Sequence, residues 1–290
     1  MSTPSGPPRL TSRGSAAAAP ALLDRVLEKL GLASRPATDL AGLGTLYAAW
    51  CRRVPFDNVR KLIHLREGLP GPLPGDDPVD FLETWLAHGT GGTCWAGNGA
   101  LWFLLSGLGF DAQRGCGTML VAPDLPPNHG TVCVGVDGAP YLVDASMLFA
   151  DPLPLSDGSR VDHPAWGVDC RADAAQELRI TWRPFHMPAL ECRIDFLGAS
   201  AEQFGRYHEA SRGWGPFNYS LSARLNRGDG VIGAAFGQHA EIDARGALSL
   251  APADRSARRQ LLVDRLGISE EMAERLPDDL PLPPPPKAGA

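Results

Sequence analysis

The spacing of apolar residues changes near Gly115, and this change limits the fold more than any other feature of the 290-residue chain. Upstream, apolar residues recur at the three- and four-residue spacing of amphipathic helices. Downstream, turn residues separate short apolar runs, which is typical of strands; the runs are CGTMLVA, TVCVGV, APYLVDA, ELRITWRPF, ECRIDFL and YSLSARL. Helices followed by a sheet or barrel predict an α+β protein.

The upstream part of the chain contains four expected helices, which start at or near Ala21, Asp39, Pro78 and Cys94. Gly31 ends the first helix. The second stops before Pro55, because the residue preceding a proline is pushed out of the α region. Thr93 is a natural N-cap for the fourth helix, which is apolar around much of its circumference and is therefore expected to be buried. Another amphipathic segment, SARRQLLVDRLGI, lies near the end of the chain.

Composition and charge exclude several classes of protein. The net charge is -6 and no dense Lys/Arg run occurs, so nucleic acid is not an expected partner. No stretch approaches 18 apolar residues, so no segment is expected to span a membrane. Residues 1–20 are expected to form a disordered arm, since their apolar run ends at Asp24 and Arg25 and is too short for a secretory signal. A cytoplasmic protein with a Pro-rich tail at 277–290 is expected.

The cysteines show no paired C-x-x-C spacing, so no zinc site or thioredoxin-like motif is expected. Five of the six are expected to be reduced and buried, namely Cys51, Cys116, Cys133, Cys170 and Cys192. Cys94 differs because it would occupy the first turn of a helix. There the free amide donors and the helix macrodipole favour an anion and lower a thiol pKa. Cys94 is therefore a candidate nucleophile.

A nucleophilic cysteine needs a base, and the base usually needs a third group to orient it. Asp137-Gly138 lies between two apolar runs and predicts a two-residue hairpin turn. In that register Thr131 faces Asp144, so His129 and Asp144 lie on one face as diagonal neighbours. A three-residue loop would turn them to opposite faces. The other six histidines lack such a partner and are expected to be structural: His64, His88, His163, His186, His208 and His239.

The stretch TGGTCWAGN resembles a motif of the arylamine N-acetyltransferases, which is close to Arg-Gly-Gly-x-Cys-x-Glu-x-Asn. Four positions agree: Gly91, Gly92, Cys94 and Asn98. Thr90 stands at the Arg position and Ala96 at the acidic or amide position. The segments VPFDNV and YLVDAS are similar to the family's Ile-Pro-Phe-Glu-Asn and Tyr-Leu-Val-Asp segments. The stretch from His239 to Ile268 is similar to its closing strands and final helix.

The resemblance implies a fold of three parts. These are an N-terminal helical bundle at 21–112 that holds Cys94, a central β-barrel at 113–212 that holds His129 and Asp144, and a C-terminal α/β lid at 213–276. It also implies pocket residues that bind the substrate. These are Phe56, Phe217 and Met147, the last standing where the family has an aromatic side chain.

The same resemblance implies a catalytic triad of Cys94, His129 and Asp144. An acyl group, most simply acetyl, would pass from coenzyme A to Cys94 as a thioester and then to an amine, hydrazine or hydroxylamine in a ping-pong mechanism. Acetyl-CoA or another acyl-CoA would be a co-substrate, with no permanently bound cofactor and no metal. The expected partners are these small molecules, and the protein is expected to be a monomer or a homo-oligomer.

Two alternatives stay open. The same residues would serve an amide synthase that releases polyketide chains, or a thiol hydrolase, with a different acyl donor. A relative of the same fold could also bind a ligand without catalysis, and the departures at Thr90, Ala96 and Met147 motivate this alternative.

Overall fold

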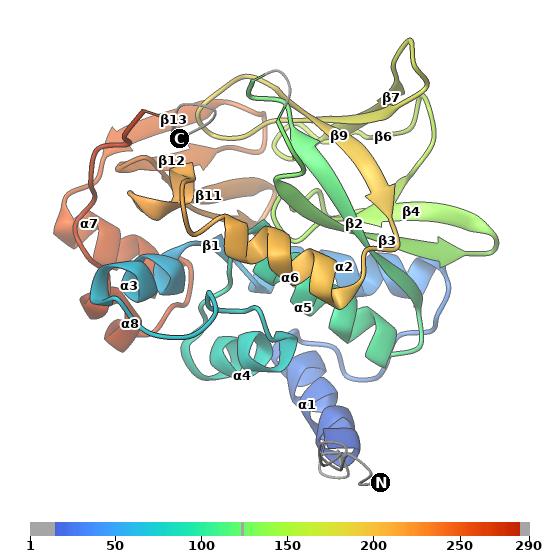
Figure 1. Ribbon diagram of the computed structural model, residues 1–290, viewed down its shortest axis with the longest axis horizontal. Helices are drawn as coiled ribbons and strands as arrows, with labels where there is room; N and C mark the ends of the chain where they lie inside the picture. Colours follow the sequence, from blue (N-terminus) through green and yellow to red (C-terminus); the bar gives the residue numbers. More distant parts are fainter. Residues whose placement is uncertain (1–14, 123–124, 285–290) are drawn as a thin grey trace, which may run out of the picture.

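The computed structural model describes residues 15–122 and 125–284. It confirms the α+β class, with a helical part, an eight-stranded sheet and a five-stranded sheet. In Figure 1 the helices lie below and between the two sheets, and the N-terminal helix projects from the molecule. The boundaries expected at residues 112, 212 and 276 stay predictions.

The helical part contains five helices, one more than expected. They are α1 (Ser15–Lys29), α2 (Leu40–Arg53), α3 (Val59–Glu67), α4 (Pro78–His88) and α5 (Cys94–Gly107). The first helix begins at Ser15, before the expected Ala21. The residues before Ala21 are mostly alanines, and alanine has the highest helix propensity of any residue type. The expected disordered arm at 1–20 therefore includes the first residues of this helix, and residues 1–14 of that arm lie outside the described part of the chain.

Helix α5 runs through the centre of the molecule. Every residue from Cys94 to Leu101 is buried, as its largely apolar circumference predicts. It packs on α4 and on the strands β2 (Asp111–Met119) and β3 (His129–Val136). This helix is therefore the element through which the helical part meets the barrel.

The eight-stranded sheet is antiparallel in the order β5-β4-β3-β2-β9-β8-β7-β6, and its two edge strands lie near one another. It is a nearly closed barrel-like sheet. The remaining strands are β4 (Ala139–Val143), β5 (Leu153–Pro154), β6 (Arg160–Val161), β7 (Val168–Ala172), β8 (Leu178–Trp182) and β9 (Leu190–Leu197). The strands β5, β6 and β7 were not expected. The first two have only two residues each, too few to show an apolar period.

The hairpin of β3 and β4 has the predicted register. Val136 is opposite Ala139, and Val132 is opposite Val143. At the turn, Asp137 has φ 51° and Gly138 has φ 78°, the positive values that a two-residue hairpin of this kind requires. The prediction that His129 and Asp144 share one face depends on this turn, and the register confirms it.

The C-terminal part is built on a five-stranded antiparallel sheet in the order β1-β10-β11-β12-β13. Its strands are β1 (Phe56–Asp57), β10 (Ala223–Arg227), β11 (Gly230–Ala235), β12 (Gln238–Ile242) and β13 (Leu248–Pro252). The edge strand β1 comes from the helical part, so an upstream segment completes this C-terminal sheet. Along the chain, α6 (Ala201–Ala210) and the 3₁₀ turn η1 (Pro216–Asn218) come after β9 of the first sheet and before β10 of the second.

The expected final helix is divided. It forms α7 (Arg255–Gln260), then a π-helical segment, η2 (Leu261–Arg265), and a separate helix, α8 (Glu270–Arg275), follows. The Pro-rich tail adds no regular element over 277–284, but it is attached, because Leu280 N–H donates to Tyr219 C=O at 2.8 Å.

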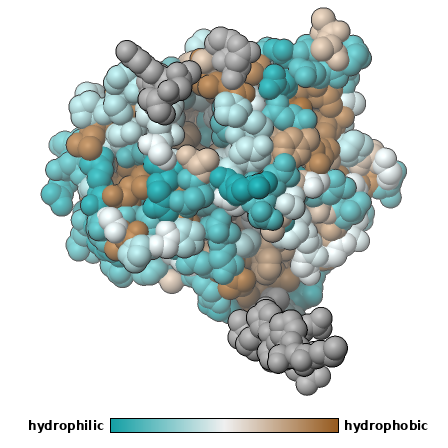
Figure 2. Space-filling view, viewed as in Figure 1, coloured by the Kyte–Doolittle hydropathy of each residue, from teal (hydrophilic) through white to brown (hydrophobic). Residues whose placement is uncertain are grey.

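The surface is mostly hydrophilic and the cysteines are buried, as expected of a chain folded around a large core. Figure 2 shows hydrophilic residues interspersed with small hydrophobic patches on the face that it draws. None of the helices in residues 15–122 and 125–284 combines the length and the apolar character needed to cross a membrane. All six cysteines are buried and free.

Candidate functional site

Cys94 is the first residue of α5, and Thr93 is the N-cap. The Thr93 side chain makes no capping hydrogen bond, so its hydroxyl does not occupy the amide donors of the first turn. Cys94 is 8% exposed, and its sulfur lies 3.9 Å from the carbonyl oxygen of Asn128. The thiol therefore lies at the positive end of a buried helix, in contact with the chain just before His129.

The loop before Cys94 is fixed by the strand β1. Gly91 N–H donates to the Asp57 carboxylate at 2.6 Å, and Phe56 forms a parallel bridge with Gly92. Burial raises the pKa of Asp57 to about 6, and hydrogen bonds from Gly91 and Val59 oppose the shift. The carboxylate therefore remains mostly ionised at neutral pH, where it ties the nucleophile loop to the start of α3.

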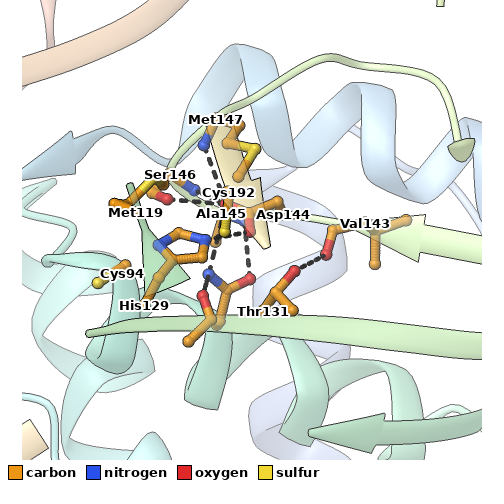
Figure 3. Close-up of polar contacts among 12 residues, drawn as sticks. Cys94, Met119, His129, Thr131, Val143, Asp144, Ala145, Ser146, Met147 and Cys192 are labelled. Atoms are coloured by element: carbon orange, nitrogen blue, oxygen red, sulfur yellow. Dashed lines mark hydrogen bonds and ion pairs between the residues drawn. The ribbon is translucent and has the colours of Figure 1, made fainter. Parts of the chain in front are cut away.

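His129 and Asp144 form a buried pair. His129 Nε2 lies 2.7 Å from Asp144 Oδ2, and the two side chains are 2% and 0% exposed. Figure 3 shows the other ring nitrogen, Nδ1, on the side of Cys94. The three residues expected from the sequence are thus brought together, with the imidazole between the thiol and the carboxylate.

Asp144 is held in place by its own loop and by α2. Its Oδ1 accepts hydrogen bonds from the backbone N–H and hydroxyl of Ser146 and from the N–H of Met147, at 2.7 to 2.9 Å. Its backbone N–H and C=O both bond to the Tyr47 hydroxyl. With Oδ1 saturated, Oδ2 is oriented toward His129.

Asn98 joins the nucleophile helix to both of its partners. Its side-chain amide donates to Gly130 C=O at 2.6 Å, and its oxygen accepts from Ala145 N–H at 2.9 Å. Gly130 follows His129, and Ala145 follows Asp144. The Asn98 side chain, one helical turn after Cys94, therefore sets the spacing of α5, β3 and the Asp144 loop.

The pKa values follow from burial and from the pair itself. Burial alone would lower the pKa of His129, but the Asp144 carboxylate and the Cys94 sulfur outweigh it and raise the pKa to about 10. Burial would raise the pKa of Asp144, but His129 and the hydrogen bonds to Oδ1 lower it to about 2. Both shifts favour an imidazolium and carboxylate pair at neutral pH.

A second cation, Lys61, interacts electrostatically with the thiol. Lys61, on α3, is 6% exposed and donates to the carbonyl and hydroxyl oxygens of Ser211. Burial lowers the pKa of Lys61 to about 8, and the negative charge of a Cys94 thiolate opposes that shift. The ammonium therefore adds positive potential at the sulfur. Sequence reasoning missed Lys61, because no local pattern shows where a side chain on α3 points.

The His129 pKa gives a direct prediction. Between pH 6 and 8 the imidazole is expected to stay protonated, since its pKa is raised above the unfolded value of about 6.5. The pair then stabilises the fold fully between about pH 4 and pH 6.5. It loses that contribution as the pH rises through about 10, where His129 deprotonates, and as it falls toward about 2, where Asp144 is protonated. Nitrogen-15 NMR of histidine-labelled protein measures this. In Asp144→Asn, where burial acts without the carboxylate, the pKa should fall below that of a free histidine. A wild-type His129 that titrates near 6.5 would contradict the prediction.

The chain is similar to known N-acetyltransferases. A family model described as N-acetyltransferase matches residues 39–176, which contain Cys94, His129 and Asp144. An arylamine N-acetyltransferase of Mycolicibacterium smegmatis is 30% identical over 182 residues. The chain is therefore similar to the arylamine N-acetyltransferases. The match with the M. smegmatis relative covers 58% of this chain and 64% of that protein, just under two thirds of its length.

Two further relatives extend the match along the chain. An arylamine N-acetyltransferase of Mycobacterium bovis is 26% identical over 253 residues, which is 81% of this chain and 86% of that protein. The solved structure of the Mycobacterium marinum arylamine N-acetyltransferase in complex with CoA superposes with a TM-score of 0.74 at 21% identity. That superposition covers 88% of this chain and 96% of the other. The fold of the N-acetyltransferase family therefore extends over nearly all of this chain.

Two departures from the family motif have visible consequences. Ala96 packs so closely on Gly75 and Gly92 that a Cβ at either glycine would lie 2.7 or 2.8 Å from its methyl carbon. A larger side chain at 96 would not fit without rearranging these glycines. Thr90 is fully buried and its hydroxyl has no partner within the described part of the chain.

The expected pocket residues are partly brought together. Phe56 and Phe217 meet edge to face, with ring centroids 5.2 Å apart and planes at 72°. Met147 is 1% exposed and lies in the same hydrophobic core as Phe56, beside the loop that holds Asp144. Their role in binding a substrate is taken up below.

Residues outside the triad complete the description of the site. Sequence reasoning noted Asn98 and the VPFDN segment as resemblances, but it did not assign them the contacts described above. A surface cleft of about 550 Å³ lies between α3, α4 and α8 and is lined by Arg60, His64 and Arg275 among others, but not by Cys94. This cleft contains no nucleophile with a paired base, in contrast to the group formed by Cys94, His129 and Asp144. Within the described ranges, no group of three or more His, Cys, Asp or Glu residues is arranged to hold a metal ion.

Proposed function

We propose that this protein is an acyl-CoA-dependent N-acyltransferase of the arylamine N-acetyltransferase kind. It would move an acyl group, acetyl in the simplest case, from coenzyme A to an amine, hydrazine or hydroxylamine. The observation that carries the proposal is the 2.7 Å bond from His129 Nε2 to Asp144, which leaves Nδ1 for the Cys94 thiol. The catalytic residues are then Cys94, His129 and Asp144.

In the first half-reaction the Cys94 thiolate attacks the thioester carbonyl carbon of the acyl-CoA. A new carbon–sulfur bond forms, and the carbonyl oxygen becomes an oxyanion. The free N–H groups of the first turn of α5 and the Lys61 ammonium are the nearby positive groups. As the oxyanion collapses, the bond to the coenzyme A sulfur breaks, and His129 gives its proton to that leaving thiolate.

In the second half-reaction the amine attacks the Cys94 thioester. His129 now accepts a proton from the attacking nitrogen, and the carbon–sulfur bond to Cys94 breaks to release the amide. Asp144 keeps the imidazole in one tautomer and stabilises its charge in both steps. Because only 8% of Cys94 is exposed, water has restricted access to the thioester.

The acceptor and donor pockets are part of the same proposal. Phe56, Phe217 and Met147 would form the apolar wall against which an aromatic acceptor packs. Coenzyme A as co-substrate is supported by the M. marinum relative, whose structure is a complex with CoA. Acetyl as the preferred acyl group, a ping-pong order and a cytoplasmic location stay proposals.

Intact-protein mass spectrometry tests this function. The protein is mixed with acetyl-, propionyl-, hexanoyl- and benzoyl-CoA, and the acyl mass is mapped to a peptide. We expect one acyl group per chain, on the peptide that contains Cys94. The adduct should be absent from Cys94→Ser and retained by Cys133→Ala, which changes another buried cysteine. Adding an aromatic amine should remove the acyl mass and yield the amide.

The other outcomes separate the alternatives. If no coenzyme A thioester gives an adduct but Cys94 still reacts quickly with iodoacetamide, the donor is of another class, as in an amide synthase or a thiol hydrolase. If Cys94 forms no adduct and also reacts slowly, the protein is a binding relative, and the acyltransferase proposal fails.

A further inference from the structure

Arg224 is a buried cation without an acidic partner. It is the second residue of β10, is 4% exposed, and forms no ion pair with a carboxylate in residues 15–122 or 125–284. Its one hydrogen bond runs from Nη1 to the carbonyl oxygen of Arg183 at 3.2 Å, and its buried Nε has no partner in the same ranges. A guanidinium carries five N–H donors, and leaving them unpaired in a protein interior is costly.

The surroundings of Arg224 add donors and positive charge but no negative charge. Its guanidinium lies 5.5 Å from the ring of Trp182 and 5.3 Å from the ring of Phe185. The indole N–H of Trp182 is also buried and unpartnered within the described residues. Burial lowers the pKa of Arg224 to about 10, and repulsion from Arg183 adds to this effect, so the group is still charged at neutral pH. Two unused donors, Arg224 Nε and Trp182 Nε1, thus lie in one buried region, beside the partly buried Arg183.

The position of Arg224 connects it to the reaction site. Arg224 is directly opposite Phe56 in the β1–β10 pair, and opposed residues on antiparallel strands share a face. Phe56 also bridges to Gly92, two residues before Cys94. At the usual strand spacing, Arg224 and Gly92 are about 10 Å apart in backbone terms, which a one-ring substrate with its substituents can span. The next inward-facing residue of β10, Asn226, bonds to Leu148 C=O, beside Met147.

We propose that Arg224, together with the indole N–H of Trp182, forms a subsite for a carboxylate carried by the substrate. A planar guanidinium presents two parallel donors that match a carboxylate, and the flanking aromatic rings suit an aryl group attached to it. The carboxylate belongs either to the acceptor amine or to a dicarboxylic acyl group, and its chemistry at Arg224 is the same in both. This inference rests on the proposed function, which places the reaction at Cys94. A binding measurement tests the subsite separately from acyl transfer.

Paired substrates test the subsite through kinetics. To test the acceptor, the rates with 3- and 4-aminobenzoate are compared with those of the matching neutral aminobenzamides, using one acyl-CoA donor. Donors are succinyl-CoA against pentanoyl-CoA, which has a similar length and no carboxylate. In the wild type, kcat/KM for the carboxylated member of one pair should exceed that of its neutral partner at least tenfold. The pair that shows this preference identifies which substrate carries the carboxylate.

Variants at two arginines of one strand supply the control. Arg224→Met should abolish the preference by raising KM for the carboxylated substrate tenfold or more, with less than threefold change for its neutral partner. Arg224→Lys keeps the positive charge and should retain part of the preference. It also provides a test if Arg224→Met does not fold. Arg227→Met, at the exposed end of β10, should leave both substrates unchanged. Equal effects of Arg224→Met on both members would show that Arg224 only supports the fold, and would overturn the proposal.

A binding measurement separates this inference from the proposed function. In Cys94→Ser, which cannot form the acyl-enzyme, 4-acetamidobenzoate and pentanedioate are tested by thermal shift, beside 4-acetamidobenzamide as a neutral control. Stabilisation by one of the anions that disappears in the double variant Cys94→Ser/Arg224→Met supports the subsite even if no transfer is found. Absence of any such difference, in a wild type that does transfer acyl groups between neutral substrates, overturns the subsite and leaves the acyltransferase proposal intact.

Discussion

Replacing Asp144 with asparagine is expected to lower kcat for acyl transfer about 10⁴-fold, the loss known for this change in a triad aspartate. The structure gives the reason. Asparagine can place its oxygen where Oδ1 accepts from Ser146 and Met147, and its NH₂ group then faces His129 Nε2. A nitrogen that receives this donor must be unprotonated, so the ring proton moves to Nδ1 and the imidazole can no longer accept the proton of Cys94.

Stopped-flow assays of amide formation measure this loss, with circular dichroism to confirm that the variant is folded. Asp173→Asn is a matched control, because Asp173 also accepts backbone N–H groups and an arginine, but at the β7–β8 turn. Its rate should stay within a few-fold of the wild type. A folded Asp144→Asn protein with near wild-type kcat would show that the pair does not serve catalysis.

The part of the site that is predictable from the sequence is the part fixed by local structure. The Asp137-Gly138 turn sets the register of β3 and β4, and the register places His129 beside Asp144. Likewise, a Thr followed by an apolar helical run places Cys94 at a helix start. In both cases a few adjacent residues determine the geometry, so the pattern alone suffices.

Contacts between distant segments were not predictable in this way. The Asp57 bond to Gly91, the Asn98 bonds to Gly130 and Ala145, and the Tyr47 bonds to Asp144 each join two elements whose packing has no local signature. The same holds for β1, which leaves the helical part to become the edge of the lid sheet. A polar residue inside an apolar run, such as Asn98 in α5, is the one signal available, since a buried amide needs partners.

The burial of Arg224 in the C-terminal sheet also could not be predicted from local sequence. The sequence gives no sign that Arg224 is buried, because its strand reads as an ordinary alternating segment. Its burial follows from the pairing of β10 with β1, which turns Arg224 and Asn226 toward the core, whereas Ala223 and Leu225 face α3 and η2. The sequence shows that residue 224 is an arginine, but only the structure shows that its guanidinium is buried without an acidic partner.

Gly91→Ala is expected to destabilise the protein by about 3 kcal/mol and to lower kcat/KM about 10²-fold. A Cβ at this position would lie 1.7 Å from the carbonyl oxygen of Pro55, far inside van der Waals contact. The obstacle is backbone, so no rotamer change can relieve it. The loop must move away from β1, which strains the Gly91 bond to Asp57 and displaces Cys94 relative to His129.

Thermal unfolding and steady-state kinetics measure the two effects, and a fall in Tm of about 10 °C corresponds to this destabilisation for a chain of this size. Gly99→Ala, in the same helix as Cys94, is the matched control. Its Cβ would meet only the Phe204 ring at 3.7 Å, an ordinary contact, so activity should be retained and stability unchanged or slightly raised. If Gly91→Ala were as stable and active as Gly99→Ala, the contact between β1 and the nucleophile loop would not be what positions Cys94.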